Sequence, residues 1–450
     1  MEYLFREHIK KQITGPSDGK ALSDICFLNR NDAKCARFFQ DSGNYHVECS
    51  YYVGADWIPH LERKWLYVEP KLNTKFDEDS GEEQKPQEEK ELVQIDVLKM
   101  LFQALEEPDV RDHTKELFEI KFDSPWIQLQ KNQDLISPLI MIQFLNQVKD
   151  IVRKGLKRSY YKVERNLYAK VKGKVLVSQT IKQNLVKNKN LNTYCQYEQF
   201  GVDGLENRLL KKTLIFIRRY LGTYKSLGSD AYFQETFNFI QPAFDEVSEE
   251  VQLHEIKHFK FNPFYKNYEK AIELAKLILQ RFSYNLNSIQ DQETILTPPY
   301  WIDMSKLFEL YVWKLLKKEF GNKIQYHERT HGNELDFLFY DDKNSLVIDA
   351  KYKPKYFGKT HQGLHDDIRQ VSGYARLREI RKRLGVSDSN LLLGCVIIFP
   401  DLNSQMDTIS DLKNNEVSQY EKVWKVGVKL PLLSQVVYPK IPNGKNLNLF

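Results

Sequence analysis

The hydrophobic pattern is most regular in the last third of the chain. In the segment SKLFELYVWKLLKKEF (305–320), apolar side chains recur at helical spacing, which predicts an amphipathic helix. Gly321 and Asn322 follow directly, as is typical of a helix end. Shorter apolar runs then predict three strands, a second helix and a continuously buried strand, in that order, over 323–329, 334–340, 345–351, 366–385 and 391–399.

The first two thirds of the chain are less regular. Loosely alternating runs predict short strands within residues 1–75, notably at 45–53 and 64–72. Other apolar runs predict three helices, over 92–105, 205–221 and 268–282, and one strand near 170–180. A chain of 450 residues is too long for one ordinary core. We therefore expect a β-containing N-terminal domain, a mainly helical middle region and a C-terminal α/β domain, over 1–150, 151–290 and 291–450.

Two acids and a lysine interrupt the adjacent apolar runs 334–340 and 345–351. Side chains alternate between the two faces of a strand, so the apolar positions share a core face and Asp336, Asp349 and Lys351 share the opposite face. The polar residues 341–344 indicate a turn, and a hairpin symmetric about it pairs positions whose numbers sum to 685. Asp336 and Asp349 would then lie directly opposite each other, with Cβ atoms roughly 5 Å apart.

Two opposed carboxylates repel each other unless something offsets their charge. A divalent cation does so, and carboxylate oxygens are the ligands that Mg²⁺ prefers; Mn²⁺ can substitute for it. Such a cation activates water and polarises a phosphoryl oxygen, while the Lys351 ammonium would orient the nucleophile. The pattern therefore predicts a phosphodiester hydrolase, although the spacing alone also fits a surface hairpin with scattered charges.

Neighbouring residues could complete such a site. Glu309, on the predicted helix before the hairpin, could supply a third carboxylate to the metal, or could simply face solvent. Gln370 and Tyr374 are four residues apart on the next helix, so they share a face from which both can donate hydrogen bonds to a phosphate or to the metal ligands. Lys353 and Lys355 follow Lys351 directly and are candidate DNA contacts.

An earlier triad has the same spacing as Asp336, Asp349 and Lys351. Asp56, Glu69 and Lys71 lie in DWIPHLERKWLYVEPK, where Pro59 disfavours a clean ladder. No amphipathic helix precedes this triad and an acidic segment follows it, so we interpret it as structural.

Charge is unevenly distributed although the net charge is only +5. Residues 149–190 hold thirteen Lys or Arg and two acids, with tyrosines between them, which is typical of a surface that binds a phosphate backbone. Lys154, Lys157 and Arg158 are the candidate DNA contacts there; a solvated helix face is the alternative. Residues 77–91 hold eight acids and two lysines, which predicts a solvated insertion.

Other features bound the class of protein. No apolar stretch approaches the roughly 18 residues needed to cross a bilayer, and the first residues lack a signal sequence, so we expect no membrane contact and a cytoplasmic location. The five scattered cysteines fit a reducing compartment. Cys26, Cys35, His46 and Cys49 are zinc-binding residue types, but they lack the tight Cys-x-x-Cys spacing of structural zinc sites.

Asp336, Asp349-Ala350-Lys351 and Gln370-x-x-x-Tyr374 resemble the PD-(D/E)xK nuclease superfamily in its Q-x-x-x-Y version. The predicted helix, three strands, helix and strand match its αβββαβ core, which implies an α/β (α+β) restriction-endonuclease-like domain. The chain departs from that motif in two places, with Leu335 where the family has proline and an aspartate as the middle acid.

The similarity extends over roughly residues 150–400 to the McrC family, the nuclease subunits of McrBC-type modification-dependent restriction systems. It rests on the segments GKVLV, LENRLLKKTL, NPFYKNYEKAIELAKLIL, IDMSKLFELYVWKLL and VIDAKYK, in that order. The resemblance implies a Mg²⁺-dependent endonuclease that cuts double-stranded DNA when a McrB-like AAA+ GTPase ring activates it, with the N-terminal part of the chain docking on the ring.

The sequence itself also indicates a separate motor. GPSDGK (15–20) is one residue short of a phosphate-binding loop, and Gly358-Lys359-Thr360 lacks the first glycine of that motif. Two alternatives stay open: a RecB-like repair nuclease that works with a helicase, and an adaptor that activates an NTPase ring without cleaving DNA. The intact Asp336, Asp349 and Lys351 argue against the adaptor.

Overall fold

The structure is a computed structural model in which the chain forms two compact units, residues 1–127 with 297–450 and residues 128–296. It describes residues 2–7, 10–14, 22–27, 33–41, 43–61, 63–70, 95–111, 113, 117–130, 135–223, 231–251, 265–287, 294–330, 333–341, 345–353, 362–386, 391–401 and 409–432. The acidic segment 77–91 lies outside these ranges. Among the described helices, none combines the length and the apolar character that crossing a membrane requires.

The first unit begins with strands, as the loosely alternating pattern predicts. A five-stranded sheet has the order β1-β7-β6-β14-β8, and a four-stranded sheet has the order β2-β5-β4-β3. Their bounds are β1 Glu2–Arg6, β2 Lys10–Ile13, β3 Ile25–Cys26, β4 Lys34–Asp41, β5 Asn44–Cys49, β6 Tyr52–Trp57, β7 Trp65–Glu69, β8 Phe118–Ile120 and β14 Tyr300–Asp303. A buried cluster that includes Phe27, Val47, Leu66 and Trp301 forms the core of this region.

Strand β14 joins the two ends of the chain. It pairs antiparallel with β6, with Trp301 opposite Gly54. A Cβ atom on Gly54 would lie 2.0 Å from the Tyr300 carbonyl oxygen, so only glycine allows this approach. The N-terminal and C-terminal segments therefore belong to one unit, which differs from the three consecutive domains expected from the sequence.

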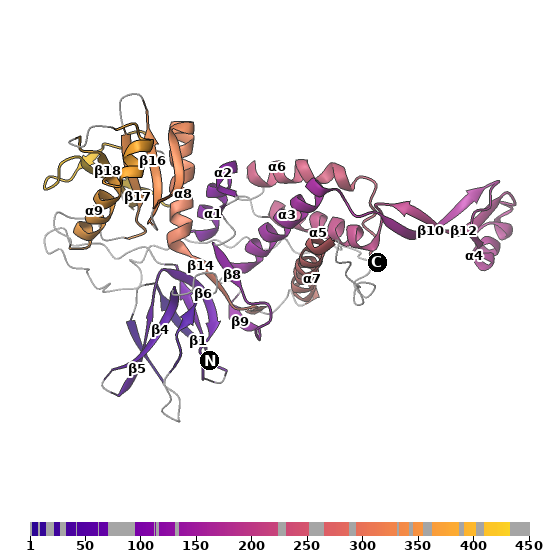
Figure 1. The fold of residues 1–450 in the computed structure, drawn as a ribbon. Coiled ribbons are helices and arrows are strands. Elements are labelled where there is room, and N and C mark those ends of the chain that lie inside the picture. The colour runs from indigo at the N-terminus through magenta and orange to yellow at the C-terminus, as the bar shows by residue number, and fades with distance from the viewer. Residues whose placement is uncertain are drawn as a thin grey trace. The chain divides into compact units, whose positions relative to one another are not determined.

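The C-terminal part of the same unit contains a six-stranded sheet of order β15-β16-β17-β18-β20-β19 (Figure 1). The elements follow the predicted order, as α8 Met304–Phe320, β15 Ile324–Thr330, β16 Asn333–Tyr340, β17 Ser345–Ala350, α9 Gln362–Ala375, α10 Arg378–Arg383, β18 Gly394–Pro400, β19 Asn415–Glu416 and β20 Val423–Val428. The helix predicted over 366–385 is in fact two helices, because Leu377 has an extended backbone (ψ 125°).

Helix α8 has the start and end that its sequence predicts. The Asp303 carboxylate caps it by accepting a hydrogen bond from Lys306 N (2.9 Å), and Gly321 ends it with a φ of 57°. Helix α8 packs against β15, β17 and α1 (Val97–Leu105), whereas α9 packs against β17 and β18. Leu338 and Val347, on the face of the hairpin expected to carry the polar groups, are fully buried in a cluster with α9 residues. The prediction of a single core face is therefore wrong, since both faces of this hairpin are covered.

The second unit is not mainly helical throughout. Helices α5 (Leu205–Thr223) and α7 (Lys266–Asn287) match and extend the predicted helices, whereas α3 (Ile136–Lys154) and α6 (Ala231–Ile240) were not predicted. Between α3 and α5, however, β10 (Ser159–Tyr168) and β12 (Asn192–Gly201) form a long antiparallel ribbon, with α4 (Val177–Gln183) between them in sequence (Figure 1). Only β11 (Lys174–Val175) occupies the strand predicted near 170–180. A separate two-stranded sheet joins β9 (Ile127–Gln130) and β13 (Thr294–Thr297).

Candidate active site

The hairpin formed by β16 and β17 has the predicted register. Its paired positions are Phe337↔Ile348, Leu338↔Val347, Phe339↔Leu346 and Tyr340↔Ser345, each of which sums to 685. The ladder ends there, one residue before Asp336 and Asp349. The Asp336 carboxylate instead accepts a hydrogen bond from Ala350 N, with a distance of 2.7 Å. The two acids therefore lie at the same end of the hairpin, while residues 342–344 of the predicted turn are outside the described residues.

A chain of contacts leads from Asp349 to helix α9. Lys351 Nζ lies 2.8 Å from Asp349 Oδ2 and donates a hydrogen bond to Gln370 Oε1 (2.9 Å). Gln370 Nε2 then donates a hydrogen bond to the Tyr374 hydroxyl (2.8 Å). The structure thus brings together Asp349, Lys351, Gln370 and Tyr374, the residues singled out from the sequence on β17 and α9. Gln370 and Tyr374 lie four residues apart on one helix face, as predicted.

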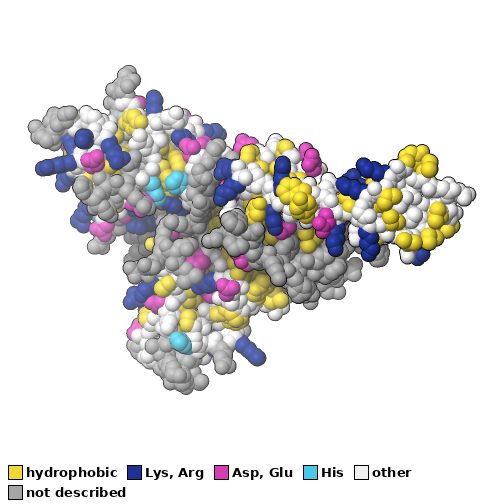
Figure 2. Space-filling model, turned by 45° about the vertical axis from the view of Figure 1, so that its right-hand side comes forward, with side chains coloured by type: hydrophobic (Ala, Val, Ile, Leu, Met, Phe, Trp, Pro, Cys, Tyr) yellow, Lys and Arg dark blue, Asp and Glu magenta, His cyan; other side chains and the backbone are white. Residues whose placement is uncertain are grey.

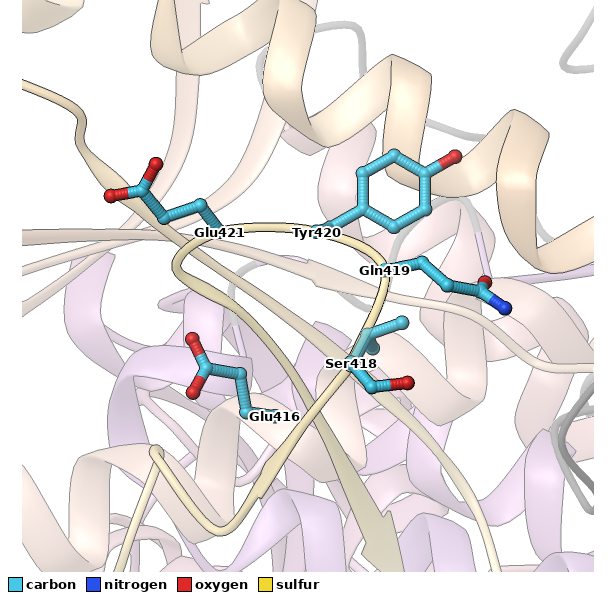
Figure 3. Close-up of a pocket in the computed structure, with 6 residues that line it drawn as sticks. Glu416, Ser418, Gln419, Tyr420 and Glu421 are labelled. Carbon is cyan, nitrogen blue, oxygen red and sulfur yellow. The ribbon is translucent and has the colours of Figure 1, made fainter.

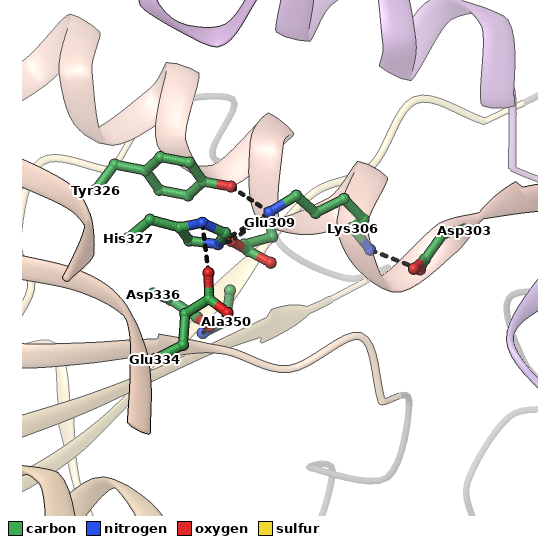
Figure 4. A network of polar contacts seen from close by, with 8 residues as sticks. All are labelled: Asp303, Lys306, Glu309, Tyr326, His327, Glu334, Asp336 and Ala350. Carbon is green, nitrogen blue, oxygen red and sulfur yellow. Dashed lines mark hydrogen bonds and ion pairs between the residues drawn. The ribbon is translucent and has the colours of Figure 1, made fainter. Parts of the chain in front are cut away.

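Glu309 approaches the same region from α8. Its Oε1 atom lies 2.7 Å from His327 Nε2 and 3.3 Å from Lys306 Nζ (Figure 4). Figure 4 shows Glu309 and Glu334 at the two nitrogens of the His327 ring, with side chains from α8, β15 and β16. Sequence analysis identified Glu309 but not its partners Lys306 and His327.

Burial and neighbouring negative charges raise the pKa values of the two hairpin acids. Burial raises the pKa of Asp336 well above its ordinary value, and the charges of Glu309 and Asp349 raise it further. Burial also raises the pKa of Asp349, although the Lys351 ammonium opposes this increase. Each carboxyl therefore lies in surroundings that disfavour its charged form, and the charge of Asp349 contributes to the shift of Asp336.

For Glu309 and Lys351, neighbouring charges outweigh the effect of burial on the pKa. Burial alone would raise the pKa of Glu309, but the hydrogen bond from His327 and the charge of Lys306 outweigh it and lower that pKa below its ordinary value. Burial alone would lower the pKa of Lys351, but the adjacent Asp349 carboxylate raises it. Glu309 is therefore held in its ionised form, and Lys351 in its ammonium form.

The donor set suits a hard divalent cation. Asp349 Oδ2 is buried and, among the residues that the structure describes, receives no well-directed hydrogen bond, although Lys351 Nζ lies 2.8 Å from it. A buried carboxylate oxygen in this state, on a side chain whose pKa the charges of Asp367 and Glu309 raise, fits the preference of Mg²⁺ for oxygen ligands. Within the described ranges, however, no three His, Cys, Asp or Glu side chains already converge closely enough to hold a metal ion, and this includes Cys26, Cys35, His46 and Cys49.

The candidate DNA contacts differ in what surrounds them. Lys353 Nζ lies 2.8 and 2.9 Å from the two carboxylate oxygens of Asp367, and Lys157 forms an ion pair with Glu206. These two lysines therefore have partners within the chain. Lys154 and Arg158 are exposed at the C-terminal end of α3 and just beyond it. Lys355 lies outside the described residues.

Asp367 is an acid of this site that the sequence analysis missed. It is 4% exposed on α9, and its charge raises the pKa of both Asp349 and Lys351. Asp367 lies three residues before Gln370 and seven before Tyr374, so all three share one helix face. This spacing could have identified Asp367 from the sequence.

In the earlier triad with the same spacing, Asp56 has structural contacts. Asp56 accepts hydrogen bonds from Lys121 Nζ (2.6 Å) and Trp301 Nε1 (3.0 Å), so it fixes the buried indole on β14. Asp56 pairs with Leu66 across the hairpin, so it does not face Glu69. Lys71 lies outside the described residues. A pocket of the first unit, formed by residues 416–421 in the turn before β20, contains none of the candidate site residues (Figure 3).

We expect Asp336→Asn to stabilise the metal-free protein. The folded-state pKa of Asp336 lies above its unfolded value, so its ionised form costs folding free energy at neutral pH. Asparagine keeps an acceptor for Ala350 N and removes the charge, so the free energy of unfolding should rise by about 1 kcal/mol. The gain should disappear as the pH falls through the raised pKa. Denaturant unfolding with a chelator present, at neutral and acidic pH, measures it.

The matched control for this prediction is Asp366→Asn. Asp366 is 70% exposed and forms an ion pair with Arg369 at the surface, so its replacement should change stability little. An Asp336→Asn protein that is less stable than the wild type at neutral pH would contradict the electrostatic description of the hairpin acids.

Comparison with known proteins gives a match over most of the chain. A family model described as the McrBC 5-methylcytosine restriction system component matches residues 52–384. No curated protein matches the chain.

Two solved structures from Thermococcus gammatolerans are similar at low identity. One is a refined half-complex from a tetradecameric assembly of McrB AAA+ hexamers with bound McrC; it is 16% identical, covers 95% of this chain and 94% of that chain, and has a TM-score of 0.36. The other is a cryo-EM structure of the McrBC complex; it is 14% identical, covers 83% of this chain and 99% of that chain, and has a TM-score of 0.27.

Proposed function

This chain belongs to the McrBC family of 5-methylcytosine restriction-system components, and from that premise we propose that it is the DNA-cleaving subunit of such a system. The proposed activity is Mg²⁺-dependent hydrolysis of phosphodiester bonds in double-stranded DNA. The observation that carries this proposal is the contact chain from Asp349 through Lys351 to Gln370, beside Asp336 and Glu309, at one end of the β16–β17 hairpin. The order of α8, β15, β16, β17, α9 and β18 supports a PD-(D/E)xK core.

Each side chain has a distinct part in the proposed reaction. Asp336, Asp349 and Glu309 would hold the cation through their carboxylate oxygens. When bound, Mg²⁺ supplies Lewis-acid polarisation of the phosphoryl oxygen and lowers the pKa of water. Lys351 would orient the attacking water and offset negative charge that develops on the phosphate.

Gln370 restrains Lys351, the residue proposed to orient the attacking water. Its carbonyl accepts a hydrogen bond from Lys351 and its amide donates one to Tyr374, so the Lys351 ammonium is held between β17 and α9. Once a phosphate enters, Tyr374 can donate its hydroxyl proton to it. Lys351 Nζ lies 2.8 Å from Asp349 Oδ2, and the negative charge of Asp349 raises the pKa of Lys351, which keeps the lysine in its ammonium form.

We propose that the partner is a McrB-like AAA+ GTPase ring, as the family resemblance implies. Neither phosphate-binding-loop candidate in the sequence is complete, which supports a motor on another chain. The exposed apolar residues of the β10–β12 segment support a protein contact there. Of eighteen large hydrophobic residues exposed in the described part, nine lie between 159 and 201: Tyr160, Tyr168, Val171, Val177, Ile181, Leu185, Val186, Leu191 and Phe200. Figure 2 shows hydrophobic and basic side chains together on this segment.

We propose a contact through residues 159–201 in addition to the docking of the N-terminal part of the chain that the resemblance implies. The N-terminal sheets have β14 and α8 as neighbours within one unit, so they also support the proposed active-site domain. The apolar side chains of the β10–β12 segment are exposed instead, and this exposure supports a contact with a partner there.

Lys154 and Arg158 are the proposed DNA contacts of the basic segment. We expect the double variant Lys154→Glu/Arg158→Glu to weaken DNA binding by the complex, because each cation that neutralises a phosphate releases counterions. The slope of log affinity against log salt should become shallower by about two. Lys157→Gln is the control, since its charge is already matched by Glu206, and it should leave the slope unchanged. An unaltered slope in the double variant would remove both residues from the DNA-binding surface.

A plasmid cleavage assay tests the proposed function. Methylated and unmethylated plasmids would be incubated with Mg²⁺ and GTP, using the chain alone and the chain with its GTPase partner. We expect cutting of the methylated plasmid only when both proteins are present. Cleavage with a helicase partner and without dependence on methylation would favour the repair nuclease, and stimulation of GTP hydrolysis without any cleavage would favour the adaptor.

A further inference from the structure

His327 has an unusual backbone for a strand residue. Its φ is 54°, in the left-handed region that residues other than glycine rarely adopt. The register of β15 and β16 passes from Tyr326↔Phe337 to Glu328↔Leu335, so His327 interrupts the ladder opposite Asp336. Local strain of this kind persists where surrounding contacts fix it, and it occurs often at functional sites. The contacts of the His327 ring therefore indicate what the strain achieves.

Aromatic neighbours fix the plane of the His327 ring. The ring stacks on Tyr326 with centroids 4.1 Å apart and an angle of 14° between the planes. Tyr326 stacks in turn on Trp313 of α8, with centroids 3.9 Å apart, and His113 meets the stack edge-on. On the other side of the ring, Nδ1 lies 2.8 Å from Glu334 Oε1. The imidazole therefore has little freedom to turn (Figure 4).

The opposite ring nitrogen reaches Glu309. His327 Nε2 and Lys306 Nζ both contact the same oxygen, Glu309 Oε1, at 2.7 and 3.3 Å. Lys306 Nζ is itself fixed, because it is 2.6 Å from the Tyr326 hydroxyl and its side chain is 5% exposed. One oxygen of the Glu309 carboxylate is thus anchored twice, and Oε2 is outside these two contacts.

We infer that His327 and Lys306 are positioning residues that keep the Glu309 carboxylate on the side of the site where Asp336 and Asp349 lie, so that Glu309 can become the third ligand when the cation binds. This inference rests on the proposed metal-dependent function. Glu309 also forms a hydrogen bond with Tyr326, and carboxylates that ligate a metal commonly keep hydrogen bonds to supporting groups of this kind. The left-handed turn at His327 directs the ring out of the strand's alternating pattern and toward α8.

Titration calorimetry with Mn²⁺ on the full chain tests this inference. His327→Phe keeps an aromatic ring in the stack and removes both ring nitrogens, so it should weaken Mn²⁺ binding at least about tenfold. Asparagine tolerates a left-handed backbone and offers an amide donor, so His327→Asn should lose less affinity. His113→Phe is the matched control, since it alters the same aromatic stack, and it should bind Mn²⁺ within about twofold of the wild type. Thermal unfolding of each protein establishes that it is folded.

Each outcome of this titration supports or overturns a specific claim. Wild-type affinity in folded His327→Phe and His327→Asn would overturn the positioning role. An equal loss in His113→Phe and His327→Phe would overturn it as well, because the stack alone would then explain the effect. If the wild type binds no Mn²⁺, or if Asp349→Asn binds it equally well, the proposed metal site fails and the positioning role fails with it.

Discussion

Replacing Asp349 by asparagine is expected to reduce DNA cleavage by the activated complex at least about a thousandfold. Asp349 is 2% exposed, its Oδ2 atom is buried without a well-directed hydrogen bond, and Lys351 depends on its charge. Asparagine keeps the size of the side chain but removes the negative charge that both the cation and Lys351 require. A single-turnover cleavage assay with partner, GTP and Mg²⁺ measures the loss.

Two measurements separate this effect from unfolding. The variant should bind the GTPase partner as the wild type does, because the exposed apolar segment proposed to dock lies in the other compact unit. Asp366→Asn, on the exposed side of α9, should cleave at close to the wild-type rate. Cleavage by Asp349→Asn within about tenfold of the wild type would mean that the site is misassigned.

Replacing Lys351 by methionine is expected to reduce cleavage by about a hundredfold or more. The ammonium is the donor placed between Asp349 and Gln370, at distances of 2.8 and 2.9 Å, and methionine retains its length without its charge. The loss should be smaller than that of Asp349→Asn, because the three carboxylates remain. The same single-turnover assay measures it, and Mn²⁺ calorimetry should show that the variant still binds the cation.

Lys353→Met provides the matched control for this lysine. Lys353 lies two residues further on and has its charge matched by Asp367 at 2.8 Å, so its loss should affect cleavage much less than the loss of Lys351. Equal losses in the two variants would indicate a general electrostatic effect and would contradict a specific role for Lys351.

The hairpin was predictable because its information is local. The polar residues between 340 and 345 and the alternation on either side fix the register, and the structure has the four pairs that sum to 685. Helix α8 was predictable for a similar reason, since Asp303 and Gly321 mark its ends. The four-residue spacing predicted that Gln370 and Tyr374 share a helix face, and the hydrogen bond between them confirms this, whereas the bond from Lys351 to Gln370 was not predicted.

Features that depend on distant residues were not predictable in this way. In the β10–β12 ribbon only Cys195 is buried and every other position is half-buried or exposed, so these strands carry a weak apolar signal. The pairing of β14 with β6 joins residues about 250 positions apart, and only the close approach at Gly54 hints at it. His327 has no local signal for its left-handed backbone, which contacts from α8 and Glu334 fix. The sequence therefore indicated the local geometry of the hairpin and of α9, whereas the grouping of segments into compact units and the supporting contacts of Glu309 depend on residues far apart in the chain.

Anomalous diffraction from crystals containing Mn²⁺ tests the central claim most directly, because it locates the cation without reference to activity. The account predicts a peak between the carboxylates of Asp336 and Asp349, at metal–oxygen distances of about 2.1 Å, with Glu309 turned toward it. A Mn²⁺ peak at another place, or none at this end of the hairpin in crystals that bind Mn²⁺ elsewhere, would contradict it.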